Sequence, residues 1–293
     1  MHVIRALARL SRPVHLLFAA LTYALGAGIA RYLGTPTQMT VLALGMMGVV
    51  LAQASMGLLG AVFRSPLAPL LENETREQRG MVRSGALYAS VGALSAMGVM
   101  GMIMHRVGSL SVSSILCLGL SLLVILLFAV PPVRAMDRGF EELLLAIQIA
   151  YLVPSIGFLL QAGSYHRLLN ACIVALTFLL FATLVALEFP TYADDLEHER
   201  LTLLTRVGWE NALRVHHVLV AAAYLLLALT AVSGFSFALL SPAFLTIPFA
   251  ILQVYWLRNI GLGARPIWNL LRANAVSIFG LTAYFLALSF WLR

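Results

Sequence analysis

An acidic stretch near the middle of the second half of the chain holds the residues best suited to chemistry. Five carboxylates crowd into this stretch, and they are Glu188, Asp194, Asp195, Glu197 and Glu199. Residues three or four positions apart lie on one face of a helix. Carboxylates grouped in this way suit Mg²⁺, which binds one or two of them together with phosphate oxygens. The alternative is a solvated acidic loop, and this stretch by itself favours neither reading.

The composition defines the elements that must position these groups. Of the 293 residues 61% are hydrophobic and 11% are charged, and the mean hydropathy is +0.94. A soluble fold of this length cannot bury so much apolar surface, whereas a bilayer accommodates it. We therefore expect an all-α protein. It is a polytopic membrane bundle of about nine transmembrane helices around a central lipid-facing cavity, with residues 1–293 forming one domain.

Runs of about 20 apolar residues, enough to cross the hydrocarbon core, place the helices. The expected spans are His15–Leu33, Met39–Phe63, Ala86–His105, Ser109–Val130, Glu141–Gly163, Leu168–Phe189, Leu213–Phe237, Pro242–Leu257 and Ala273–Trp291.

The arginines predict the orientation of the bundle. All 19 basic residues are arginine, and nine spans place only Arg31, Arg106, Arg167 and Arg293 on the side opposite the N-terminus. Because cytoplasmic loops carry the excess of basic residues, we expect a cytoplasmic N-terminus, an external C-terminus and a location in the inner (plasma) membrane. The polar chemistry then lies at the cytoplasmic mouth. Many single arginines there are also explained as interfacial anchors.

The acidic stretch resembles the second signature of the UbiA superfamily of intramembrane prenyltransferases. The branch that makes menaquinone precursors, the dihydroxynaphthoate prenyltransferases, is the most similar. The matching positions are Glu188-Phe189-Pro190, Tyr192, Asp195, Thr202-Leu203, Arg206 and Gly208. Arg200 stands at the family's lysine, and Thr191 stands where the first aspartate of the motif belongs.

Two further segments carry the resemblance. Val130–Gly139, followed by Glu142, resembles a family segment in which two arginines face the diphosphate, and Arg134 and Arg138 fit these positions. Phe128 stands at the family's tyrosine. Arg12-Pro13 resembles the Arg-Pro pair at the family's first helix.

The first signature of the family departs from its pattern in this chain. The family's asparagine and three aspartates align with Ser65, Pro66, Pro69 and Asn73, followed by a matching Arg83-Ser84-Gly85. In the family, two acidic motifs hold the magnesium ions that clamp a prenyl diphosphate. The resemblance therefore implies the fold, but with the first metal-binding motif degenerate.

The resemblance implies a set of roles for individual residues. Catalytic roles fall to Asp195, Arg200, Arg134 and Arg138. Substrate-binding roles fall to Asn73, Arg83, Phe128, Glu188, Tyr192, Gln148 and Gln161. Asp195 and Asp194 are the expected ligands of Mg²⁺, the cofactor if the protein is catalytic.

Two functions remain open from the sequence. One is a prenyltransferase-family protein that binds a polyprenyl diphosphate or quinone-type lipid and transfers the prenyl chain to an aromatic acceptor. The other is a catalytically degenerate homologue that binds an isoprenoid or quinone, or serves as a subunit of a membrane complex. Membrane lipids are partners in both, and nucleic acid is in neither. Met97, Met100, Met102 and Met104 either line a lipid tunnel or pack beside small residues.

The orientation is testable with reporter fusions. A reporter that is active only outside the cytoplasm should be active when fused after Arg293 and inactive when fused at the N-terminus. The same reporter fused into the expected external loop at 106–108 serves as the positive control. Activity of the N-terminal fusion would refute the assigned orientation.

Overall fold

The computed structural model describes residues 2–64, 70 and 75–293. Within these residues every regular element is helical, and nine stretches are long and apolar enough to cross a membrane. The single-helix spans are α2 (Pro13–Tyr32), α3 (Met39–Val62), α4 (Arg76–Arg106), α5 (Val112–Ala129), α11 (Trp209–Val232) and α14 (Trp268–Trp291). The all-α fold with nine spans is therefore confirmed.

The other three spans are built from several pieces each. One joins α6 (Glu141–Ala146), η2 (Ile147–Leu152) and α7 (Val153–Ala162); another joins α8 (Arg167–Glu188), η3 (Phe189–Thr191) and α9 (Tyr192–Glu197); the last joins α12 (Phe237–Leu240), η4 (Ser241–Thr246) and α13 (Ile247–Gly261). The short helices α1 (His2–Leu10), η1 (Ala135–Arg138) and α10 (Leu203–Val207) complete the described part of the chain.

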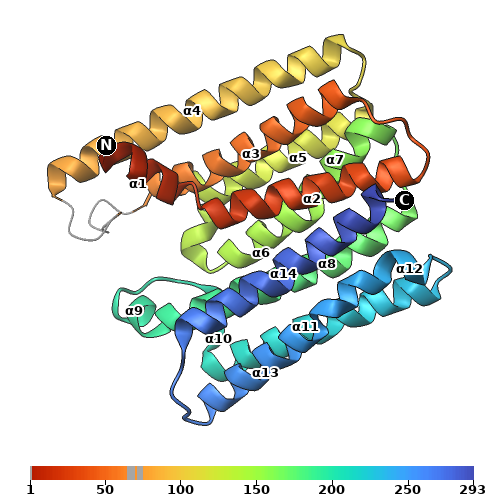
Figure 1. The fold of residues 1–293 in the computed structure, drawn as a ribbon. Helices are drawn as coiled ribbons and strands as arrows, with labels where there is room; N and C mark the ends of the chain where they lie inside the picture. The colour runs from red at the N-terminus through yellow and green to blue at the C-terminus, as the bar shows by residue number, and fades with distance from the viewer. Residues whose placement is uncertain (1, 65–69, 71–74) are drawn as a thin grey trace.

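The helices lie roughly side by side, with α4 at one edge of the molecule and α11 and α13 at the other (Figure 1). The span formed by α6, η2 and α7 is 78% buried in its most apolar window, against 11% for α4. The core therefore lies around α2, α6, α7, α8 and α14. We name the end at which α2, α6, α11 and α14 begin the ionic end, because the charged groups described below lie there.

The third span is longer than its apolar run predicted. It begins at Arg76 instead of Ala86, so the helix projects beyond the apolar stretch. Thr75 explains this start, because its side chain accepts a hydrogen bond from the Gln78 amide (3.2 Å) and the Gln78 side chain accepts one from the Thr75 amide (3.1 Å). Such a capping box satisfies two helix-end donors whatever the hydropathy of the sequence.

A proline shapes the span formed by α6, η2 and α7. Pro154 lies inside this span and removes one backbone donor, while its ring crowds the preceding turn. Just before it, the helix widens into the π-helical turn η2, which contains Gln148. Turns of this kind re-aim side chains and are frequent at functional sites.

The short helix α1 lies at the ionic end against α3 and α4 (Figure 1). Its Ala6 is buried in a small cluster with Ala61 and Val82, while Arg5 and Arg9 are exposed. Apolar residues on one face and arginines on the other are typical of a helix that lies in the plane of a membrane interface.

Two glycines allow α2 and α7 to approach closely. A Cβ added at Gly26 would collide with the Pro154 carbonyl, and one added at Gly157 would collide with the carbonyl of Tyr23. Without a hydrophobic force between helices in lipid, close packing through such small residues is a main source of association.

Replacing Gly26 tests this contact. Gly26→Ala should lower the free energy of unfolding by about 1–3 kcal/mol, the usual cost of forcing extra volume into a packed core. Denaturant unfolding in detergent micelles measures the change. Gly92 has no atom near its missing Cβ, so Gly92→Ala is the matched control and should leave stability unchanged or raise it. Equal losses for both variants would contradict the packing role of Gly26.

Candidate functional site

A cavity of about 430 Å³ opens at the ionic end among α2, α6, α8 and α14. It is lined by Arg12, Pro13, Val14, His15, Glu141, Glu142, Leu145, Leu184, Leu187, Glu188, Arg200, Arg272 and Val276. We name it the ionic cavity. Its charged residues come from separate segments of the chain, and its leucines and valines provide an apolar wall beside them.

A buried carboxylate organises the charges of this cavity. Glu141 is 4% exposed and forms ion pairs with Arg12 and, at 3.3 Å, with Arg200. Arg200 also pairs at 3.4 Å with Asp195, which is 5% exposed. Thr191 donates a hydrogen bond of 2.9 Å to the second Asp195 oxygen. The result is a continuous Arg12–Glu141–Arg200–Asp195 network.

Local backbone geometry brings these residues together. Arg12 has φ 55°, a left-handed turn directly before Pro13 opens α2. Glu199 has φ 51°, and the turn it makes lets the Arg200 amide donate to the Asp195 carbonyl at 2.8 Å. Left-handed conformations cost energy for residues other than glycine and persist where surrounding contacts impose them. Both turns lie at or next to the arginines that hold Glu141.

The helix that carries Glu141 also favours its charge. Glu141 and Glu142 occupy the first turn of α6, where the helix dipole stabilises negative groups. Glu142 accepts a hydrogen bond of 3.0 Å from the Leu203 amide through Oε1. Its Oε2 is buried without a partner, as is the Oε2 of Glu188. Both free oxygens belong to residues that line the ionic cavity.

The network stabilises the positive charge of Arg200. Burial by itself lowers the pKa of this guanidinium. The carboxylates of Glu141, Glu188 and Asp195 outweigh burial, so the pKa of Arg200 lies above its ordinary value. Burial and then the charges of Arg200 and Arg12 lower the pKa of Arg64, which follows the end of α3.

The predicted site residues divide into those that the structure brings together and those that it separates. Arg200 and Glu188 line the ionic cavity, and Asp195 is joined to it through its ion pair with Arg200. Tyr192 packs its ring against Trp209, with centroids 5.6 Å apart. Asp194 is exposed in the first turn of α9. Asn73 lies outside the described residues.

The predicted diphosphate-facing arginines are held by local contacts. Arg134 pairs with Asp137, and Arg138 donates to the Pro132 carbonyl at 2.9 Å. Phe128 is buried in α5, and the Arg12 guanidinium lies 6.0 Å from its ring centroid. Phe128 therefore lies close to the arginine that binds Glu141.

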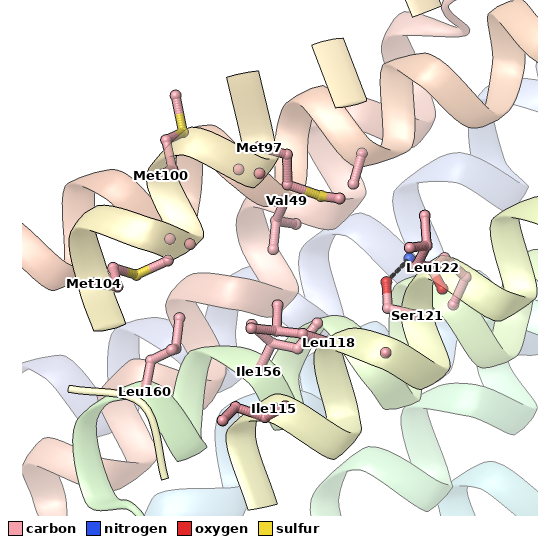
Figure 2. Close-up of a pocket in the computed structure, with 17 residues that line it drawn as sticks. Val49, Met97, Met100, Met104, Ile115, Leu118, Ser121, Leu122, Ile156 and Leu160 are labelled. Carbon is pink, nitrogen blue, oxygen red and sulfur yellow. Dashed lines mark hydrogen bonds between the residues drawn. The ribbon is translucent and has the colours of Figure 1, made fainter. Parts of the chain in front are cut away.

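The remaining candidates lie elsewhere in the bundle. Arg83 donates to the Arg64 carbonyl at 2.9 Å, which ties α4 to the end of α3. Gln161 accepts a hydrogen bond of 2.9 Å from the Gln38 amide, at the end of the bundle opposite the ionic end. Gln148 lines a separate apolar hollow, shown in Figure 2.

The described residues do not fit the magnesium clamp that the resemblance implies. None of their His, Cys, Asp and Glu side chains form a group of three or more that could hold a metal ion. Asp195 is the expected principal ligand, yet Arg200 occupies one of its oxygens and Thr191 the other. A hydroxyl that donates to Asp195 stands where the family places a carboxylate.

Two central residues, Glu141 and Arg12, were not among the predicted site residues. The pair spans most of the first half of the chain, so no local spacing connects them. The sequence did contain one indication of Glu141: it is a second glutamate beside Glu142, at the expected start of a helix and at the end of the bundle that is rich in arginine. A buried carboxylate at a membrane boundary requires a cationic partner.

The fold and site define a polytopic helical membrane protein with a charged cavity at one end. No protein-family model matches the chain, and no curated protein matches its sequence significantly. Solved structures do match its fold. A UbiA homologue from Archaeoglobus fulgidus, bound to GPP and Mg²⁺, is 18% identical with a TM-score of 0.65, covering 98% of this chain and 100% of that one.

Two other solved structures have a similar fold. The apo structure of a UbiA homologue from Aeropyrum pernix K1 is 17% identical with a TM-score of 0.67, covering 92% of this chain and 96% of that one. A digeranylgeranylglyceryl phosphate synthase structure is 13% identical with a TM-score of 0.61, covering 100% of this chain and 98% of that one. The chain therefore has the fold of the UbiA homologues.

The role of Glu141 is testable by its removal. Glu141→Ala should lower the free energy of unfolding by roughly 2–3 kcal/mol, because two partly buried guanidinium groups lose a charged hydrogen-bond partner. Denaturant unfolding in micelles gives the value. Glu210 forms an exposed pair with Arg214 at 3.9 Å, so Glu210→Ala should change stability by less than about 0.5 kcal/mol. If Glu141→Ala changed the free energy of unfolding as little as Glu210→Ala, the ion-pair network around Glu141 would not contribute to the stability of the fold.

Proposed function

We propose that the chain is a member of the UbiA superfamily that binds a polyprenyl lipid with its polar headgroup in the ionic cavity. The fold supports this, because solved structures with the same fold include homologues bound to GPP or DMAPP with Mg²⁺. The motifs around Arg12, Arg134 and Asp195 support it independently of the fold. A polyprenyl diphosphate or a quinone-type lipid is the proposed ligand.

The single observation that carries the proposal is the cavity in which three arginines and three glutamates lie beside an apolar wall. Arg12 and Arg200 present guanidinium groups, and Leu184, Leu187 and Val276 line the same space. A diphosphate binds guanidinium groups through paired hydrogen bonds. A prenyl chain is apolar, so its contact with such a wall, away from water and charge, lowers the free energy of binding.

Binding at this site requires an exchange of partners. Glu141 already neutralises Arg12 and part of Arg200, so an anionic headgroup competes with this carboxylate. Arg272 adds positive charge at the same mouth. The proposed bound state has the headgroup among the guanidinium groups and Glu141 still held at the start of α6.

Transfer of the prenyl chain to an aromatic acceptor is the second candidate function. In such a transfer the bond between the allylic carbon and diphosphate oxygen breaks, and negative charge grows on the leaving diphosphate. Arg12 and Arg200 would stabilise that charge, and stabilisation of developing charge usually accelerates a reaction more than any other effect of the protein. Magnesium supplies this stabilisation when bound in a clamp of carboxylates. The engaged oxygens of Asp195 favour lipid binding over efficient transfer.

The same site suits a quinone-binding or structural subunit of a membrane complex, as the sequence also allowed. We propose for either function that residues 1–293 form one domain in the inner membrane, with the mouth of the ionic cavity on the cytoplasmic side.

Water-soluble molecules would then reach the ionic cavity from the cytoplasm, and membrane lipids would reach its apolar wall.

Binding and transfer can be separated in one preparation. Purified protein in lipid nanodiscs should bind radiolabelled geranylgeranyl diphosphate saturably, with similar affinity in magnesium and in EDTA, because arginines supply the contacts. Arg200→Gln should weaken binding about tenfold or more, the loss expected for a charge-assisted hydrogen bond of about 1.5–3 kcal/mol. Arg214→Gln, an exposed arginine on α11, is the control and should bind normally.

The transfer assay decides between the two candidate functions. With dihydroxynaphthoate or hydroxybenzoate as acceptor and magnesium present, we expect little or no prenylated product. Robust turnover that Asp195→Ala abolishes would overturn the binding-only assignment and establish a magnesium-dependent transferase. Absence of any saturable binding would refute both candidates.

A further inference from the structure

A second hollow, of about 310 Å³, lies in the half of the bundle away from the ionic end, among α3, α4, α5 and α7. Its lining is Gly45, Gly48, Val49, Ala52, Met97, Gly98, Met100, Gly101, Met104, Ile115, Leu118, Gly119, Ser121, Leu122, Gln148, Ile156 and Leu160. Figure 2 shows the methionines of α4 on one side and residues of α5 and α7 on the other. We name it the apolar hollow.

The apolar hollow is separate from the ionic cavity. No residue lines both, and their walls come from different helices except for the α6–η2–α7 span. The lining of the apolar hollow contains no charged residue. It therefore offers nothing to neutralise a phosphate or a carboxylate, and a charged ligand would be buried there without a partner.

Small and flexible side chains create the apolar hollow. Gly98, Gly101 and Gly119 have no atom within 4 Å of a missing Cβ, so these glycines leave open space instead of closing a helix contact. Met97 and Met104 add side chains that adapt to the shape of an apolar occupant. Of the two alternatives for the methionines, the structure favours the lining of an apolar space.

One polar group inside the apolar hollow lacks a partner. Gln148 is 1% exposed and donates a hydrogen bond of 2.7 Å from Nε2 to the Ser121 hydroxyl, which Figure 2 shows as a dashed line. Its Oε1 is buried without a hydrogen-bond partner. A buried amide oxygen left unpaired is costly, and it is satisfied by a hydrogen-bond donor that enters the space.

Gln148 and Ser121 together present one hydrogen-bond acceptor and one donor to a molecule in the apolar hollow. Gln148 Oε1 accepts a hydrogen bond, and Ser121, whose oxygen accepts from Gln148, retains its own hydroxyl hydrogen as a donor. A hydroxyl group both donates and accepts, so one alcohol satisfies both positions. The π-helical turn η2 carries Gln148 and directs it to Ser121.

We propose that the apolar hollow binds a neutral alcohol with an apolar chain, with its hydroxyl at Gln148 and Ser121 and its chain along α3 and α4. Gly45 to Ala52, the lining segment of α3, rises roughly 10 Å, which accommodates a short apolar chain and leaves a longer chain to extend into lipid. The volume is at the low end for small-molecule sites, which run from about 300 to 1,000 Å³. This site does not depend on the proposed function of the ionic cavity.

The test compares matched ligands on the intact protein in nanodiscs. Radiolabelled farnesol should bind saturably, whereas farnesene, the matched hydrocarbon without the hydroxyl, should compete roughly tenfold less well or worse. Gln148→Leu should weaken farnesol binding roughly three- to tenfold, because it removes the acceptor and keeps the volume apolar. Equal affinity for farnesol and farnesene, or normal farnesol binding by Gln148→Leu, would overturn the proposal and leave a water or a lipid tail as the partner of this space.

Glycine variants locate the binding site. Gly101→Leu fills the apolar hollow and should abolish farnesol binding, while Gly92→Leu, on the same helix with equally open space and outside the lining, should bind normally. If the two variants bound farnesol equally well, farnesol would not bind in the apolar hollow. Geranylgeranyl diphosphate binding, which Arg200→Gln should weaken, should be unchanged in Gly101→Leu, so failure at one site is distinguishable from failure at the other.

Discussion

The structure depends on how a membrane protein keeps charge at the boundary of an apolar bundle. Glu141 is almost fully buried at the start of α6, and its charge is compatible with that position only because Arg12 and Arg200 share it. The cost of leaving such a carboxylate unpaired is several kcal/mol. This requirement joins the beginning of the first span, the beginning of the fifth and the loop after the sixth, and so defines the shape of the cavity.

The contacts of Asp195 differ from the magnesium clamp of the family that the motifs of this chain resemble. Where a carboxylate would stand in the family, Thr191 donates a hydrogen bond to Asp195, and Arg200 occupies the other oxygen. A guanidinium is a fixed, permanently charged group, whereas a metal ion is exchangeable. The partners of Asp195 are therefore supplied by the chain itself.

Most of the fold was predictable from sequence, because lipid demands long apolar runs and leaves little freedom in where they begin and end. The exceptions have local physical causes: the capping box at Thr75 extends the third span, and Pro154 introduces a π-helical turn. The site was predictable only where its residues are close in sequence, as for Asp195 and Arg200. Glu141 and Arg12 meet through tertiary packing, so no spacing rule identifies them.

The position of α1 has a consequence for how the cavity responds to its surroundings. This helix carries exposed Arg5 and Arg9 and leads within two residues into Arg12. The guanidinium that holds Glu141 thus follows directly after a helix that carries two exposed arginines. In the proposed orientation, anionic lipid would attract Arg5 and Arg9, and the lipid composition of the membrane would then bear on the position of Arg12.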